Sequence, residues 1–381
     1  MTLSGKNIRS VVEWVLGRGG YSITVPVMDG PLRPNDIIEQ SALVAEAPGI
    51  DNLLVKGDGL IASAGCDLLE ISVSGSVTRR LRFDGPISCL AISPMGTIAV
   101  GIDGVGVRLL GGKFDGMVIE RHATGPMRCP TAAIFEDENT IVVTNGSSDV
   151  RAADWARDLL SIGQSGTVVR FVLERGTSVN LAFGLRFPSG LCFDAANKRI
   201  IVSEAWAHRL IALDGGQQVP PKEVLGDLPA YPGRISASLK SGFWLSCFAV
   251  RSQLQEFILS ERRYRHVMMT EVEPRFWIAP TLSSGHSFKE PLQEGGVIRL
   301  GIHKPWAPTR SYGLVVRLDA DIRPVWSAHS RANGVRHGVT SIAEFDGEVY
   351  VTAKGSGELL RISTVDMPSA FGPALFQGGC I

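Results

Sequence analysis

The stretch VKGDGLIASAG, residues 55–65, shows the pattern on which this sequence is built. A short turn rich in glycine and aspartate leads into a run of apolar and small residues typical of a β-strand. Five further stretches repeat this turn and strand at a period of roughly 40 residues, and such self-similarity indicates a repeat architecture. They read SPMGTIAVGI (93–102), EDENTIVVTNG (136–146), DAANKRIIVSE (194–204), LKSGFWLSCF (239–248) and FDGEVYVTAK (345–354).

Strands that recur at this period predict the blades of a propeller, so we expect an all-β fold, a six-bladed β-propeller spanning residues 46–381. Residues 1–45 lack the repeat and are expected to supply an N-terminal helix and a ring-closing segment. Apolar residues recur at helical spacing from Ile8 to Leu16. Glu13 interrupts them, which argues against a secretory signal.

Two insertions interrupt the repeat. The strand cores at Phe243 and Val349 are too far apart for one blade, so we expect an insertion at about 250–310, with a helical part near residues 250–275. A second extra piece covers 147–166. Insertions between blade strands lie on one face of a propeller, where they cover the channel mouth or, alternatively, pad the rim or form a subunit contact. The oligomeric state stays open.

The bulk composition limits the partners. Net charge is zero and charged residues make up 20% of the chain, so no field is available to attract nucleic acid or a membrane surface. No apolar run reaches the roughly 18 residues that a membrane helix needs. The six cysteines form no CxxC pair, which favours free thiols in a reducing, cytoplasmic environment. We therefore expect a small-molecule substrate in the central channel and no cofactor.

Three segments carry a family resemblance. Residues 181–215, with LAFGLRFPSGLCFDAANKRIIVSEAWAHRLIALDG, 228–246, with LPAYPGRISASLKSGFWLS, and 338–362, with GVTSIAEFDGEVYVTAKGSGELLRI, resemble the strictosidine synthase-like branch of the gluconolactonase and paraoxonase superfamily. The resemblance implies a six-bladed propeller. It also implies one of two chemistries, which are calcium-dependent hydrolysis of lactones or esters and metal-free condensation of an amine with an aldehyde.

The positions that bind calcium in such proteins have changed here. The resemblance implies acidic or amide side chains at four places, where this chain has Ile50, Thr131, Ser189 and Gly233. Calcium takes six to eight oxygen ligands, and carboxylates set its affinity. We therefore expect no metal site. The glutamate that the condensation would require is replaced by Thr340, which cannot move protons near neutral pH.

Polar residues at the starts of the innermost strands are the candidates for substrate binding. Arg234 offers a planar fork for a carboxylate, or alternatively forms an internal ion pair with Asp51. Asn145 precedes Gly146 and is alternatively only a turn residue. The substrate-binding candidates are Arg234, Asp51, Asn145, Ser189, Thr131 and Thr340.

Lys354, Glu204 and His337 are the candidates for moving protons. Glu204, together with His208, alternatively ties loops, and Lys354 alternatively projects into solvent. With these residues we expect a metal-independent enzyme that acts on a small polar metabolite, by hydrolysis of a lactone or ester or by lyase or condensation chemistry. The alternative is a non-catalytic propeller that binds a small molecule or a protein partner.

Overall fold

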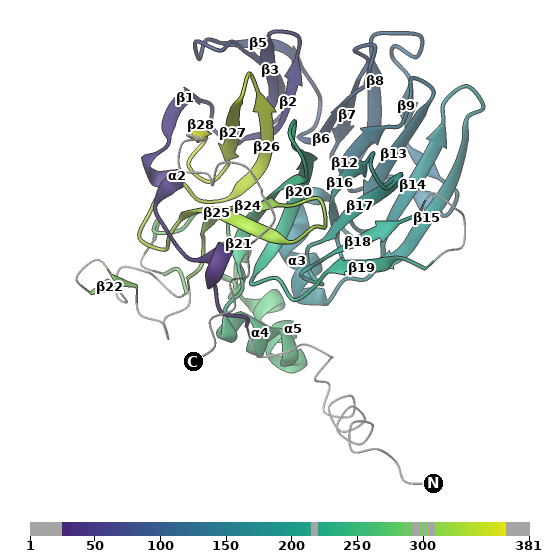
Figure 1. Cartoon of the computed structure of the whole chain (residues 1–381). Coiled ribbons are helices and arrows are strands. Elements are labelled where there is room, and N and C mark those ends of the chain that lie inside the picture. The colour runs from purple at the N-terminus through teal and green to yellow at the C-terminus, as the bar shows by residue number, and fades with distance from the viewer. Residues whose placement is uncertain are drawn as a thin grey trace, which may run out of the picture.

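The computed structural model describes residues 25–214, 220–287, 289–291, 298–299, 302–303 and 309–362. Within these ranges, six four-stranded antiparallel sheets are arranged as the blades of a propeller (Figure 1), as the sequence predicts. Each innermost strand contacts the innermost strands of its two neighbours, so the blades form a closed ring. These innermost strands are β2 (Ile50–Lys56), β6 (Ile87–Ile92), β12 (Pro130–Phe135), β16 (Pro188–Asp194), β20 (Ala230–Ala237) and β26 (Val339–Phe345).

The outer strands follow in sequence order in five of the six blades. The first three blades are completed by β3 (Gly59–Ala64), β4 (Asp67–Ile71), β5 (Val77–Arg82), β7 (Ile98–Ile102), β8 (Gly106–Leu110), β9 (Val118–Ile119), β13 (Thr140–Asn145), β14 (Gly166–Val172) and β15 (Thr177–Leu185). The last three are completed by β17 (Arg199–Glu204), β18 (Arg209–Leu213), β19 (Lys222–Leu225), β21 (Phe243–Val250), β24 (Gly313–Leu318), β25 (Pro324–Ser330), β27 (Glu348–Ala353), β28 (Glu358–Ile362) and β1.

Strand β1 (Ala42–Glu46) closes the ring. It pairs antiparallel with β28, so the first strand of the chain becomes the outer strand of the last blade. Pairing the two ends of the repeat removes a gap between blades that would otherwise expose strand edges. Most of β1 lies within residues 1–45, from which a ring-closing segment was expected. The helix expected between Ile8 and Leu16 lies outside the described residues.

The hydrophobic core is divided among the interfaces between blades. The middle strands are buried almost throughout, because each blade packs between two others. For example, Val142 and Val168 of the third blade pack in one cluster with Ile200 and Val202 of the fourth. This arrangement explains why β13 and β17 read as nearly continuous apolar runs rather than as a strict alternation.

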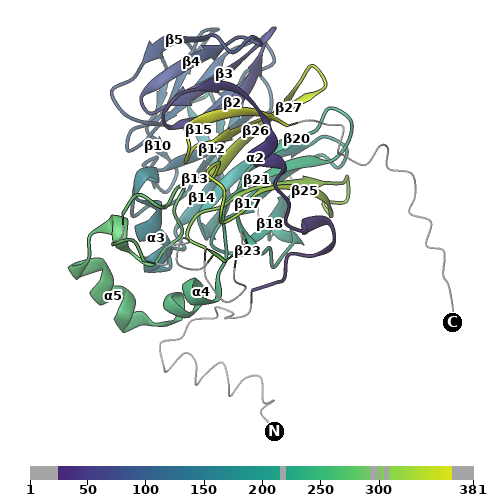
Figure 2. The same cartoon turned by 90° about the vertical axis from the view of Figure 1, so that its left-hand side faces the viewer.

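Helices gather on one face of the ring (Figures 1 and 2). The third blade inserts η2 (Ala152–Asp154) and α3 (Trp155–Ser161) between β13 and β14. The fifth inserts α4 (Gln253–Ser260), α5 (Arg262–Glu271) and η3 (Pro274–Phe276) between β21 and β24, which confirms the predicted helical insertion. Helices α3 and α5 contact each other, so the two insertions form one cover. The smaller elements are η1 (Gly30–Leu32), α2 (Ile37–Gln40), β10 (Arg121–His122), β11 (Gly125–Pro126), β22 (Ile298–Arg299) and β23 (Ile302–His303).

Candidate functional site

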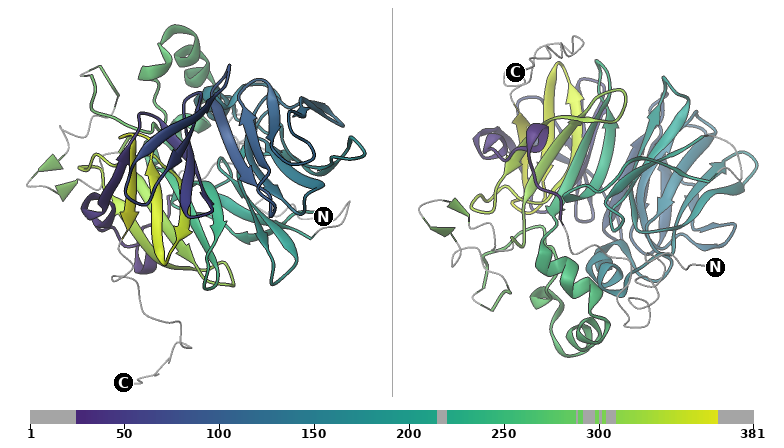
Figure 3. Two further views of the ribbon diagram at one scale, coloured as in Figure 1. Left: turned by 90° about the horizontal axis from the view of Figure 1, so that it is seen from above. Right: turned by 60° about the horizontal axis from the view of Figure 1, so that its bottom comes forward.

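A ring of polar residues lies at the helix-covered end of the channel, one from the start of each innermost strand. All six line a cavity of about 350 Å³. Figure 3 shows the blades and the inserted helices from two further sides. We call these residues the polar ring. They are Asp51, Ser88, Thr131, Ser189, Arg234 and Thr340.

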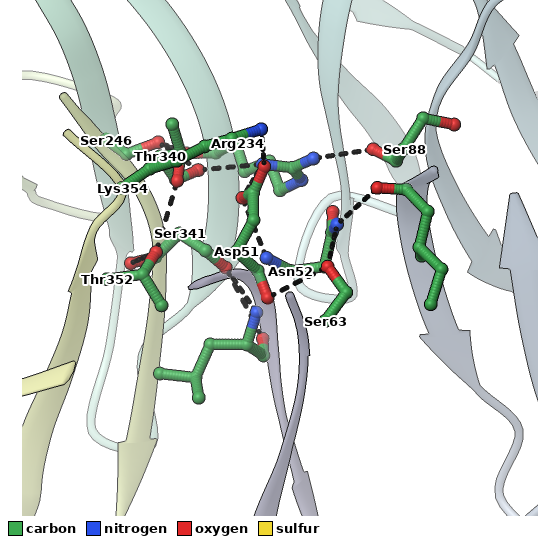
Figure 4. A network of polar contacts seen from close by, with 12 residues as sticks. Asp51, Asn52, Ser63, Ser88, Arg234, Ser246, Thr340, Ser341, Thr352 and Lys354 are labelled. Carbon is green, nitrogen blue, oxygen red and sulfur yellow. Dashed lines mark hydrogen bonds and ion pairs between the residues drawn. The ribbon is translucent and has the colours of Figure 1, made fainter. Parts of the chain in front are cut away.

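Arg234 crosses the channel and joins four blades (Figure 4). From the fifth blade, its Nη1 donates to Asp51 Oδ1 at 2.7 Å and to the Thr340 carbonyl at 3.1 Å, and its Nη2 donates to the Ser88 carbonyl at 2.7 Å. Lys354, which follows β27, donates to the other oxygen of Asp51 at 2.9 Å. One carboxylate therefore sits between two cations, and we call these three residues the charged cluster.

The charged cluster fixes the protonation state of Asp51. Burial on its own would raise the pKa of this carboxyl, but Arg234 and Lys354 outweigh that effect and lower the pKa to about 2. Asp51 is therefore ionised at neutral pH. The Lys354 side chain is 34% exposed, against 6% for Asp51, so the ammonium group is the part of the cluster most open to a ligand.

Two hydroxyl groups of the polar ring connect neighbouring blades. Thr131 Oγ1 donates to the Pro188 carbonyl at 2.6 Å, and Ser189 Oγ donates to the Pro232 carbonyl at 2.8 Å. Thr340 Oγ1 lies 3.2 Å from Thr352 Oγ1 within the last blade. These side chains line the cavity, but their hydrogen bonds already stabilise the ring.

Aromatic side chains form the wall of the cavity beyond the polar ring. Trp206, in the turn between β17 and β18, stacks on Phe187 with ring centroids 4.6 Å apart. Trp155 from α3 lies 6.0 Å from Trp206 and 5.5 Å from Phe248. All four line the cavity, and we call them the aromatic wall.

The insertions are fastened over this cavity. Asp103 of the second blade accepts hydrogen bonds from the backbone N–H groups of Ala152 at 2.6 Å and Ala153 at 3.1 Å, and so holds η2. Leu282, from the fifth-blade insertion, lies directly over Gly355, where a Cβ atom would overlap the Leu282 carbonyl. Both insertions therefore contribute lining residues. This arrangement corresponds to the first alternative drawn from the sequence, in which the insertions cover the channel mouth.

Three of the residues singled out in the sequence lie away from the cavity. Asn145 Oδ1 accepts from the Cys129 N–H at 2.8 Å inside the third blade. Glu204 accepts from the Arg186 N–H and from Arg209, so it ties loops together, as its alternative interpretation held. His337 bridges Ser311 and the Arg331 carbonyl and is 3% exposed. None of the three lines the cavity, so the structure does not bring them together with Lys354.

The structure also places residues in the cavity that the sequence analysis missed. Ser88 occupies in the second blade the place of Thr131 in the third, and counting back from each turn would have found it. Trp155, Trp206 and Asp103 were missed because they lie in an insertion and in turns, where the repeat gives no register. Phe187, directly before β16, and Phe248, in β21, were missed as well.

The donor set at this site does not fit calcium. Asp51 already binds two cations, and the hydroxyls of Thr131 and Ser189 donate to backbone carbonyls. Ile50 belongs to the hydrophobic core, and the Arg234 guanidinium crosses the channel. Within the described ranges, no group of three or more His, Cys, Asp or Glu residues could hold a metal ion.

Five cysteines in the described part of the chain are free thiols: Cys66, Cys89, Cys129, Cys192 and Cys247. Burial raises the pKa of Cys89 to about 12. This thiol is therefore protonated at neutral pH and is a poor nucleophile. Among the described helices, none has the length and apolar character needed to cross a membrane.

Neither a family model nor a curated protein matches this sequence. Solved structures do. A gluconolactonase from Xanthomonas campestris is 12% identical, with a TM-score of 0.55 over 90% of this chain and 97% of that chain. A luciferin-regenerating enzyme is 10% identical, with a TM-score of 0.51 over 84% of this chain and 93% of that chain.

At these identities the comparisons establish the fold. The protein is a six-bladed β-propeller with the fold of these structures, which is the fold that the resemblance in its sequence implied. In its channel an aspartate, an arginine and a lysine form the charged cluster.

Proposed function

We propose that this protein is a metal-independent hydrolase of lactones or esters that acts on a small metabolite in the channel cavity. The observation that carries the proposal is the Lys354 ammonium. It is fixed against Asp51, it lines the cavity, and about a third of its side chain is exposed. The likeness of the fold to gluconolactonases supports the same reaction class.

Lys354 supplies the positive charge that hydrolysis requires. Attack of water on the substrate carbonyl carbon moves the C=O electron pair onto oxygen, and the Lys354 N–H groups stabilise the resulting oxyanion. The attacking water gives up a proton, and the tetrahedral intermediate then expels the ester or ring oxygen, which takes up that proton. One water is consumed and a hydroxy acid, or an acid and an alcohol, is released.

Arg234 and Asp51 act as positioning residues in this scheme. Asp51 accepts from both cations and holds Lys354 over the cavity. The planar fork of Arg234 reaches three acceptors at once. Condensation of an amine with an aldehyde is less favoured, because Thr340 stands where that reaction would require a glutamate and its hydroxyl lies against Thr352.

A second candidate function is non-catalytic binding of a small anionic molecule. It is favoured by the fact that both carboxylates that line the cavity are engaged. Asp51 is held by two cations and Asp103 by two backbone N–H groups. Under either function the partner is a small molecule, and the free thiols are in keeping with a reducing, cytoplasmic location.

The test is turnover of a panel of aliphatic, aromatic and sugar lactones and esters in the presence of a chelator. We expect hydrolysis by the natural protein and a loss of at least about a hundredfold in kcat/KM for Lys354→Met, as for the removal of one oxyanion donor. Lys222→Met, at an exposed position of β19, is the matched control and should retain full activity. Binding without turnover across the panel would favour the second candidate.

A further inference from the structure

The channel cavity has two chemically different regions. The charged cluster comes from the starts of the innermost strands and from the end of β27. The aromatic wall comes from an insertion (Trp155), a turn (Trp206), the residue before β16 (Phe187) and strand β21 (Phe248). A ligand that reaches Lys354 therefore has its remaining atoms beside four aromatic rings.

The aromatic wall offers ring faces and few hydrogen-bonding groups. The one polar atom of Trp206, its Nε1, donates to Asp158 at 2.8 Å and is unavailable to a ligand. Phe187 and Phe248 have no polar side-chain atom. A polyhydroxylated ligand would lose water from its hydroxyl groups on entering this space without gaining new partners, which disfavours its binding.

The backbone conformation of Phe187 indicates that the surrounding structure holds its ring in the cavity wall. Phe187 has a φ angle of 56°, in the left-handed region that bulky residues rarely adopt. This conformation lies directly before Pro188, where the chain enters β16, and the Phe187 ring lines the cavity and stacks on Trp206. Strained backbone of this kind persists where the surrounding structure holds it, and it is frequent at ligand sites.

Trp155 is the most adaptable member of the wall. It is half-buried, whereas Trp206 is 1% exposed. It comes from α3, which the Asp103 bonds to η2 hold over the channel. Trp155 is therefore the member that a ligand ring can contact and that a substitution can remove with least damage to the core.

We infer that the cavity takes a flat ring-bearing carboxylate or carboxylic ester, with its carbonyl end at Lys354 and its ring against Trp155 and Trp206. Aromatic rings gain from offset or edge-to-face contact with one another beyond simple burial. This inference adds a substrate class to the proposed function and rests on it only for the position of the carbonyl end. It also separates this channel from one built for sugar lactones.

Calorimetric titration of the full chain tests the inference with three carboxylates that share a head group: naphthoate, cyclohexanecarboxylate and gluconate. Naphthoate is expected to bind at least about tenfold more tightly than gluconate, with cyclohexanecarboxylate between them. Trp155→Ala should weaken naphthoate binding about tenfold, while Trp155→Phe should keep most of the affinity. Phe183→Ala, which removes a surface ring that is 79% exposed, is the control.

Melting temperatures of all variants show whether each one is folded. The inference is overturned if no probe binds, if gluconate binds as tightly as naphthoate, or if folded Trp155→Ala binds naphthoate normally. Failure of the hydrolase proposal gives a different result. In that case naphthoate binds as described, yet no lactone or ester in the panel is hydrolysed. Preferential hydrolysis of sugar lactones would instead support the hydrolase and overturn the substrate class.

Discussion

The two halves of the central channel are built by the same six strands but carry different side chains. The polar ring lies toward the helix-covered ends of these strands, and its Asp51 and Arg234 form the charged cluster with Lys354. Further along, the same strands line a second cavity of about 420 Å³ with mainly apolar side chains such as Leu90, Leu191 and Ile342, and Arg234 borders both cavities. The fold thus tolerates an apolar channel lining, and the packing of the blades does not explain the buried charges.

Buried ion pairs are costly, because two groups must be removed from water. If the channel only had to close the ring, leucine and isoleucine would suffice at both ends, as they do in the half away from the inserted helices, which we call the apolar half. The charges at the helix-covered end therefore point to a ligand. The contrast between the halves can be tested by substitutions that act on one half and spare the other.

The largest effect is expected from Asp51→Asn. This change leaves Arg234 and Lys354 without their carboxylate and should lower the free energy of unfolding by about 3–5 kcal/mol. Glu70→Gln is the matched control, because Glu70 also lies between a lysine and an arginine but is 47% exposed. We expect the control to cost about 1 kcal/mol or less in urea unfolding. Equal losses for the two variants would contradict the account of the charged cluster.

In the apolar half, Leu191→Ala should destabilise the fold without changing ligand binding. Leu191 is 5% exposed and packs between the third and fourth blades, so its truncation should cost about 2–5 kcal/mol of unfolding free energy. Affinity for naphthoate is expected to stay unchanged. Leu239→Ala, at a site that is 71% exposed, should do neither. A marked loss of affinity in folded Leu191→Ala would show that the two halves are coupled.

Acid should weaken the polar half specifically. The pKa of Asp51 is lowered from 3.8 to about 2 in the folded protein. Its contribution of about 2 kcal/mol is therefore fully present above pH 4 and is lost as the pH falls toward 2, because the unfolded chain binds the proton first. Unfolding free energies measured across this window should fall more steeply for the natural protein than for Asp51→Asn. Parallel curves would show that Asp51 has an ordinary pKa.

Ser189→Ala is expected to have a smaller effect. It removes the hydrogen bond to the Pro232 carbonyl between the fourth and fifth blades and should cost about 1 kcal/mol. Chemical denaturation measures the loss, and lactone turnover should be retained. If folded Ser189→Ala lost most of its lactone turnover, Ser189 would have to act on the substrate and not only stabilise the contact between blades.

Calcium should have the smallest effect of all. A ligand that binds only the folded state raises its melting temperature, and the closed charged cluster leaves no place for the ion. Millimolar calcium or a chelator should shift the melting temperature by less than about 1 °C. A rise of several degrees with calcium would mean that the cluster opens to admit a metal.

The repeat made the fold predictable, because a turn followed by a buried strand recurs in each blade and fixes where every innermost strand begins. That register also located Asp51, Thr131, Ser189, Arg234 and Thr340 at the cavity. It failed for Glu204 and His337. A residue near a strand end points into the channel or toward a neighbouring loop according to turn geometry, which the repeat does not encode.

The aromatic wall escaped prediction for a related reason. Trp155 and Trp206 come from an insertion and a turn, and only the contact between blades and insertions brings them together. From the sequence, the partner of Arg234 was either a ligand or Asp51, because a sequence cannot show which acceptor is closer. In the structure Arg234 makes three bonds to protein groups, and Lys354 is the more exposed of the two cations that line the cavity.

A crystal structure of the full chain with bound naphthoate tests the central claim most directly. We predict that the carboxylate lies within hydrogen-bond distance of Lys354 Nζ, that the ring lies against Trp155 and Trp206, and that the bond from Arg234 to Asp51 is intact. The claim would be contradicted if naphthoate bound in the apolar half of the channel, or outside the channel without contacting Lys354.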